Sequence, residues 1–133
     1  MGSVVSGLKR KWQVRSQDSS SDIDSSSYVE VYSFTSKPLK GGTYKVSWFL
    51  EGLRNTPGGG SSNLRVRFLI DGVEVGTDLL ILLDDEWQST SGWIFIDFED
   101  GDTPVLSVEG RIVSASATLS VRRVKYALEF KEI

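Results

Sequence analysis

Carboxylates are the residues of this sequence whose number and spacing best suit chemistry. The chain has neither cysteine nor histidine. Disulfides, zinc sites of the Cys/His type and catalytic triads that need cysteine or histidine are therefore excluded. A metal site or a hydrolytic centre in this chain must be built from Asp and Glu.

The first carboxylate cluster lies in the segment DFEDGD, which contains Asp97, Glu99, Asp100 and Asp102. Oxygen ligands so close in sequence suit Ca²⁺, although their spacing is not that of an EF-hand loop. Asp and Gly are also the residues that tight turns use. We therefore predict a turn, with calcium binding as the alternative and no other cofactor.

The second cluster is Asp84, Asp85 and Glu86, directly after the apolar run at 79–83. Such a triplet suits a catalytic or metal site, but it is also typical of a solvated strand end. Glycoside hydrolysis needs two carboxylates at a fixed separation in a cleft, and a domain of 133 residues leaves little room for one. We predict that the protein is not an enzyme, and keep a hydrolase that uses the acidic turns as an alternative.

Four tryptophans offer a second kind of chemistry, because exposed indole rings can form stacking platforms for sugars. Trp48 and Trp93 lie within alternating segments, and we predict that they belong to the core. Trp12 and Trp87 lie beside polar or charged residues, and we predict that they are the platform or contact residues.

The N-terminal segment combines bases with one of these tryptophans. Lys9, Arg10, Lys11 and Arg15 surround Trp12, and seven of the twelve residues from 16 to 27 are serine. We predict a basic arm and a Ser-rich linker over residues 1–27, followed by a folded domain over 28–133. Base–aromatic alternation occurs in proteins that bind single-stranded nucleic acid, but one short cluster on an acidic chain favours a contact with protein.

Charge is segregated along the sequence although the net charge is only −3. Residues 68–110 contain eleven acids and no base, whereas the rest contains fifteen bases and seven acids. These segments either neutralise each other within the fold or present complementary patches to neighbouring molecules. No apolar run is long enough to span a membrane, and the N-terminus lacks a secretory signal, so we predict no membrane partner.

The elements that must position these residues are β-strands. From residue 28 onward apolar and polar residues alternate with period two, and Gly, Pro and Asp turns recur about every ten residues. Asp71-Gly72 predicts a tight hairpin. We predict about eight strands in an antiparallel, jelly-roll-like β-sandwich. In the last strand the apolar phase changes at Arg122-Arg123, which predicts a β-bulge there.

Several of these segments carry a family resemblance. They are SSSYVEVYSFTSKPLKGGTYKVSWFLEG, LRVRFLIDGVEV, SGWIFIDF and SATLSVRRVKYALEF, which together extend from about Ser25 to Phe130. They resemble small β-sandwich proteins of tailed bacteriophages and prophages. The segment from Val105 to Val113 departs from that pattern, because it lacks a turn of the Gly-His-Thr type.

The resemblance implies a structural protein of the virion, most simply a capsid decoration or cement protein. Its expected partners are other virion proteins, foremost the major capsid protein, and further copies of the chain, for example in a trimer. Expected contact residues are Lys9, Arg10, Lys11, Trp12, Arg15, Asp84, Asp85, Glu86 and Trp87. The alternatives are an accessory protein of the tail, neck or fibre, and a carbohydrate-binding module for host-surface glycans.

Overall fold

Nine β-strands make up the part of the chain that the computed structural model describes, which is residues 12–55, 61–83, 86–114 and 118–131. No helix occurs in these ranges, so the all-β prediction is confirmed. Within the same ranges there is no helix long and apolar enough to cross a membrane. The strands are β1 (Trp12–Gln17), β2 (Ser21–Ile23), β3 (Val29–Thr35), β4 (Gly42–Arg54), β5 (Ser61–Ile70), β6 (Val73–Leu83), β7 (Gln88–Phe98), β8 (Val105–Ser114) and β9 (Leu119–Phe130).

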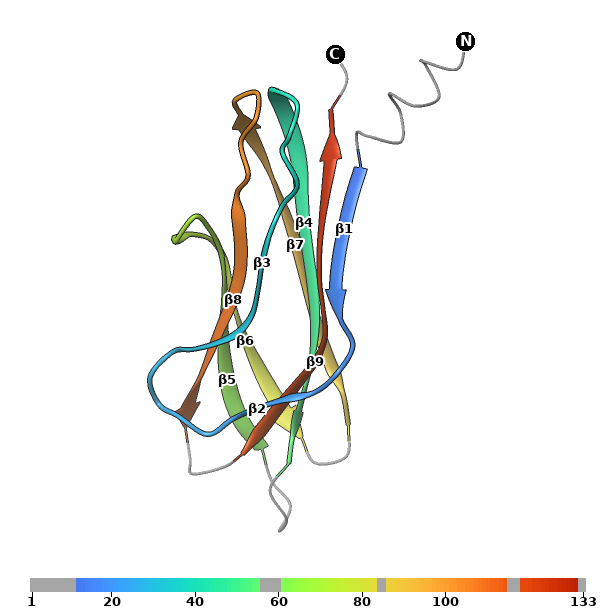
Figure 1. The fold of residues 1–133 in the computed structure, drawn as a ribbon. Helices are drawn as coiled ribbons and strands as arrows, with labels where there is room; N and C mark the ends of the chain where they lie inside the picture. Colours follow the sequence, from blue (N-terminus) through green and yellow to red (C-terminus); the bar gives the residue numbers. More distant parts are fainter. Residues whose placement is uncertain (1–11, 56–60, 84–85, 115–117, 132–133) are drawn as a thin grey trace.

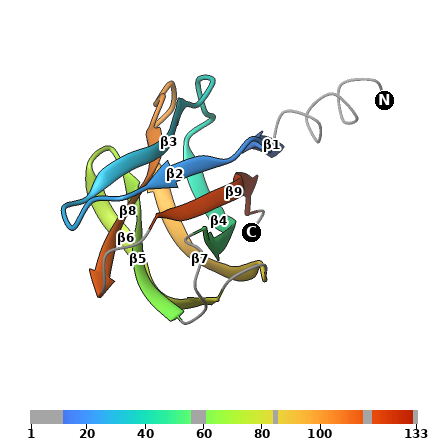
Figure 2. The same cartoon turned by 90° about the horizontal axis from the view of Figure 1, so that it is seen from below.

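The strands form two antiparallel sheets that face each other across the core (Figures 1 and 2). Sheet A has the order β1-β9-β4-β7, and sheet B has the order β3-β8-β5-β6. β1 pairs with the second half of β9 and β2 with its first half. The two short strands thus follow one another along the same edge of β9.

The pairings are nested, which defines the topology. β5 pairs with β6, β4 with β7, β3 with β8, and β1 and β2 with β9. The chain is therefore one long hairpin folded over so that its strands are divided between two sheets. This is the arrangement of a jelly roll, and the predicted jelly-roll-like sandwich is confirmed.

The core lies between the sheets and follows the predicted alternation. Tyr44, Val46, Trp48 and Leu50 all point inward from β4. The indole of Trp48 stacks on Phe68 of β5, with ring centroids 5.2 Å apart. Rings from both sheets therefore interdigitate in the middle of the sandwich, as close packing of two sheets requires.

The turn predictions are also confirmed. Asp71 and Gly72 have φ of 51° and 80°, the positive values that a type I′ hairpin requires at both central residues. β9 changes register against β4 next to Arg123, whose φ is 52°. The predicted bulge therefore keeps both halves of β9 facing the core.

The structure corrects the expected domain boundary. Residues 12–17 and 21–23, which were predicted to be arm and linker, are strands of sheet A, and Ile23 is 1% exposed. They pair because β9 would otherwise leave its edge N–H and C=O groups open. Their polar composition concealed this pairing. The expected contact residues Lys9, Arg10 and Lys11 lie outside the described residues, as do Asp84 and Asp85.

Candidate functional site

The described members of the predicted contact set do not form one surface. The backbone of Trp12 pairs with Glu129, and the guanidinium carbon of Arg15 lies 5.7 Å from the ring centroid of Phe34. Glu86 is exposed and forms an isolated bridge with Leu83. Arg15 lies on β1 and Glu86 lies just before β7. These two strands are at opposite edges of sheet A.

Trp87 is half-buried under an arginine. The guanidinium carbon of Arg122 lies 3.8 Å from the centroid of the indole, and its Nε donates to Oε1 of Glu51 at 2.8 Å. Arg123 adds a second, longer ion pair to the same carboxylate. One face of this indole is therefore occupied within the molecule.

The acidic turn uses its carboxylates to close loops. Oδ1 of Asp97 accepts from the hydroxyl of Thr43, and Oδ1 of Asp100 accepts from the backbone N–H of Gly41. Oδ2 of Asp102 accepts from the N–H of Glu99 at 2.8 Å. No group of three or more acidic side chains in the described part of the chain is arranged to hold a metal ion. The predicted turn is present.

An exposed aromatic pair, which the sequence pattern did not predict, lies on the outer face of sheet A. Trp93 is 57% exposed and Phe95 45% exposed on β7, and their ring centroids are 5.2 Å apart. The prediction that Trp93 belongs to the core is wrong. Ile94 and Ile96 alternate with this pair and pack against the core instead.

A row of small and apolar residues runs from Trp93 across the sheet. Ser47 on β4 lies opposite Trp93, Ala127 on β9 lies opposite Ser47, and Val14 on β1 lies opposite Ala127. Because directly opposed residues share a face of the sheet, all four belong to the outer face. Small side chains in the middle of the row leave a groove of about 410 Å³, lined by Ser47, Trp48, Phe49, Lys125 and Ala127.

Lysines border the aromatic pair. The Nζ atom of Lys45 lies 5.2 Å from the centroid of Trp93, and that of Lys131 lies 4.6 Å from the centroid of Phe95. A smaller hollow of about 190 Å³ lies beside them, lined by Lys45, Phe95, Glu129, Phe130 and Lys131. Two exposed rings, each with a lysine ammonium over it, therefore make up this surface, and we call Trp93, Phe95, Lys45 and Lys131 the sheet A platform.

The core beneath the platform is apolar and holds tyrosines in their neutral form. Burial raises the pKa of Tyr32 and Tyr44, and it raises the pKa of Tyr126 furthest. The Tyr126 hydroxyl donates to the carbonyl of Ser107 at 2.7 Å. These groups stabilise the fold and do not reach the sheet A platform.

Comparisons with known proteins identify the fold. No family model matches the chain, and no curated protein matches it in sequence. The C-terminal domain of EclA, described as a sugar-binding protein, has a TM-score of 0.56 and 17% identity over 82% of this chain and 77% of that chain.

Chains of infectious bursal disease virus are also similar. The Gt strain gives a TM-score of 0.56 and 13% identity, covering 90% of this chain and 33% of the viral chain. The T13 particle gives a TM-score of 0.51 and 10% identity, covering 90% of this chain and 31% of the viral chain. This chain thus spans about a third of the viral chains. These likenesses show a β-sandwich fold that occurs both in a sugar-binding protein and in an icosahedral virus particle.

Proposed function

We propose that this chain is a non-enzymatic binding domain that holds a carbohydrate, such as a host-surface glycan, against the sheet A platform. The observation that carries the proposal is the exposure of Trp93 and Phe95 at two successive outer positions of β7. The two exposed rings meet edge to face, with an interplanar angle of 68°, so together they form an angled apolar surface against which the C–H face of a pyranose ring can pack.

The surroundings of the rings supply what specificity requires. Ligand sites combine an apolar lining with a few placed polar groups. Lys45, Lys131 and Glu129 lie around Phe95, and Ser47 and Lys125 line the adjoining groove. The likeness to the sugar-binding domain of EclA, which extends over most of both chains, supports the same function.

The test is a glycan array followed by titration of the hits, monitored by tryptophan fluorescence. We expect W93A/F95A to lower affinity at least tenfold, about 1.4 kcal/mol, because both stacking faces are removed. W93F, which retains a ring, should lose less. Since both side chains are about half exposed, the free energy of unfolding should fall by only about 1 kcal/mol per substitution, which leaves the protein folded.

The matched control is V73A/I81A, which removes two apolar side chains that are 65% and 61% exposed on sheet B. It should bind like the unmodified protein. An array without hits, or equal affinities for W93A/F95A and the control, contradicts carbohydrate binding at this platform.

A second candidate is the virion role, favoured by the nested strand order and by the likeness to viral particle chains over 90% of this chain. The proposed protein is a bacteriophage decoration or cement protein that binds the major capsid protein, or a tail, neck or fibre accessory protein. It stabilises the shell through homo-oligomeric and capsid contacts.

The proposed arm can be tested by deletion. Removal of residues 1–11 leaves β1 intact, so the sandwich should keep its stability. The deletion variant should show lower occupancy on capsids, and the particles should have lower heat resistance. Full occupancy and unchanged heat resistance would contradict a contact role for Lys9, Arg10 and Lys11.

A further inference from the structure

Two arginines lie directly opposite each other on the outer face of sheet B. Arg65 on β5 is the register partner of Arg111 on β8. Opposed residues of an antiparallel pair have Cα atoms about 4.5 to 5.5 Å apart. Like charges in such a pair destabilise the sheet. The arrangement therefore needs a compensating interaction.

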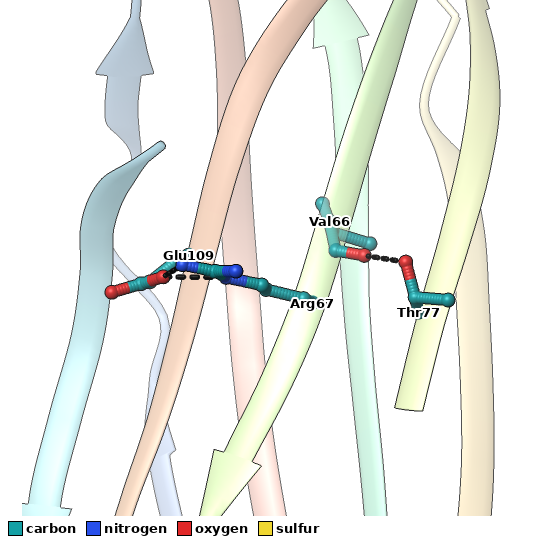
Figure 3. Close-up of polar contacts among 4 residues, drawn as sticks. All are labelled: Val66, Arg67, Thr77 and Glu109. Carbon is teal, nitrogen blue, oxygen red and sulfur yellow. Dashed lines mark hydrogen bonds and ion pairs between the residues drawn. The ribbon is translucent and has the colours of Figure 1, made fainter. Parts of the chain in front are cut away.

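The neighbouring pair is compensated within the molecule. Arg67, two residues further along β5, donates through Nε to Oε1 of Glu109 at 2.6 Å (Figure 3). Among the described residues no carboxylate forms an ion pair with Arg65 or Arg111. Glu30, the other acid nearby, lies opposite Glu109 on β3 and not opposite the arginine pair.

The ring of Tyr28 contacts the guanidinium groups of Arg67 and Arg111. The ring of Tyr28 lies 3.9 Å from the guanidinium carbon of Arg67 and 5.4 Å from that of Arg111. Leu79 lies opposite Arg65 on the other side, and Thr77 donates to the carbonyl of Val66 at 3.0 Å (Figure 3). Arg65 thus stands between an apolar side chain and a second cation, with no opposite charge as its register partner on either side.

We propose that Arg65 and Arg111 bind a tetrahedral oxyanion, sulfate or phosphate, on sheet B. Each guanidinium presents a planar fork of N–H donors that matches two oxygens. A carboxylate presents two oxygens in one plane, whereas the four oxygens of sulfate or phosphate point in different directions and can accept from both forks. The site lies on the sheet opposite the sheet A platform, so it is independent of the proposed carbohydrate function.

Charge reversal gives a test in which the direction of the change in Tm distinguishes loss of the anion site from loss of the fold. Arg65→Glu places an acid opposite Arg111, so the variant should lose anion binding while its Tm in chloride rises by about 2 to 4 °C. R65Q/R111Q should also lose binding without a fall in Tm. The control is K37Q/R123Q, which removes two exposed bases elsewhere.

The probes are sodium sulfate, sodium phosphate and a heparin oligosaccharide, titrated calorimetrically at constant ionic strength. The unmodified protein and K37Q/R123Q should bind, and R65Q/R111Q should bind at least tenfold more weakly. Binding of heparin and sulfate above phosphate supports the site and identifies sulfated glycans as its source. Equal binding of phosphate supports the site as one for small free anions.

Three results overturn the proposal. The first is equal affinity of R65Q/R111Q and the unmodified protein for every probe. The second is absence of anion binding together with a self-association that R65Q/R111Q abolishes, which assigns the arginines to an acidic surface of a second copy. A Tm of R65E below that of the unmodified protein contradicts the charge repulsion on which the site rests.

Discussion

At the scale of single residues, the buried hydroxyl of Tyr126 shows how the core accommodates a polar group. Its side chain is fully buried on β9, and its hydroxyl donates a hydrogen bond to the carbonyl of Ser107 in the opposite sheet. Desolvation raises the pKa of the phenol well above its usual value of 10.0, because the phenolate would lose its hydration. The folded state therefore keeps this proton where the unfolded chain releases it.

This difference predicts alkaline destabilisation. Since the pKa of Tyr126 is higher in the folded state than in the unfolded chain, its contribution to the free energy of unfolding is fully present below pH 10.0. This contribution is lost as the pH rises above that value. We expect Tyr126 alone to lower the free energy of unfolding by about 1.4 kcal/mol per pH unit there, with Tyr32 and Tyr44 adding to the decline. Urea titrations from pH 8 to 11.5 would measure it.

Tyr126→Phe is the matching variant. It should be less stable at neutral pH by about 1 kcal/mol, because the hydrogen bond is lost. Above pH 10.0 its stability should decline less steeply than that of the unmodified protein. Parallel declines for the two proteins would show that Tyr126 does not control the alkaline transition.

Two tryptophans show where residue patterns stop being informative. For Trp48 the alternation on β4 predicts the core correctly, because its outward neighbours include Lys45, Ser47 and Glu51. On β7 both faces are apolar, with Trp93 and Phe95 on one and Ile94 and Ile96 on the other. Period-two alternation cannot choose between two apolar faces, so the sheet A platform was not predictable from the strand itself.

At the scale of elements, Trp48 fixes how the edges of the two sheets meet. A Cβ added to Gly76 of β6 would lie 2.4 Å from its Cζ2, and a Cβ added to Gly92 of β7 would lie 2.7 Å from its Nε1. The indole thus fills the space between the two edge strands. Both positions require the absence of a side chain.

Gly92→Ala is therefore expected to destabilise the protein although alanine generally suits a strand better than glycine. The indole is rigid and stacked on Phe68, so overpacking should cost about 1 to 3 kcal/mol, and the displaced Trp48 should change its fluorescence. Thermal unfolding measures the cost.

The control for this prediction is Ser91→Ala at the exposed neighbouring position. Its stability should stay within about 0.5 kcal/mol of the unmodified protein. If Gly92→Ala proves as stable as Ser91→Ala, β7 can move away from Trp48 without cost, and the indole does not fix the sheet edges.

Elements with a polar composition were the ones that the sequence failed to predict. Alternation located most of β3 to β9, although the apolar run at 79–83, which is the second half of β6, does not alternate; turn chemistry located the Asp71-Gly72 hairpin and the β9 bulge. β1 and β2 have only one clear anchor in the core, Ile23. They form because β9 offers an open edge, and the local sequence gives no sign of an edge that lies about a hundred residues away along the chain.

At the scale of the whole molecule, folding converts the segregated sequence charge into a spatial pattern. Part of it is neutralised internally, as by Arg67 and Glu109. Loops 36–41, 71–72 and 99–104 meet at one end, joined by bonds such as that from Gly101 N–H to the carbonyl of Leu39. This end carries Asp71, Glu99, Asp100 and Asp102 against Lys37 and Lys40.

Among the described residues, the outer face of sheet A carries further bases, including Lys45 and Lys125. An acidic end of one copy against a basic face of the next is a head-to-tail contact, which closes into a ring or continues as a filament. The homo-oligomer expected of the virion role can therefore arise from charge complementarity between unlike surfaces.

This arrangement predicts an oligomer that depends on salt. Size-exclusion chromatography with light scattering should give a defined oligomer at low salt and smaller species at about 1 M salt, where the Debye length falls from about 10 Å at 0.1 M to about 3 Å. Glu99→Lys, at an exposed position of the acidic end, should weaken the oligomer at low salt. Glu30→Lys, on β3, serves as the charge-matched control. A monomer that is indifferent to salt would show that the charges balance within one copy, and assembly would then require the capsid surface as a template.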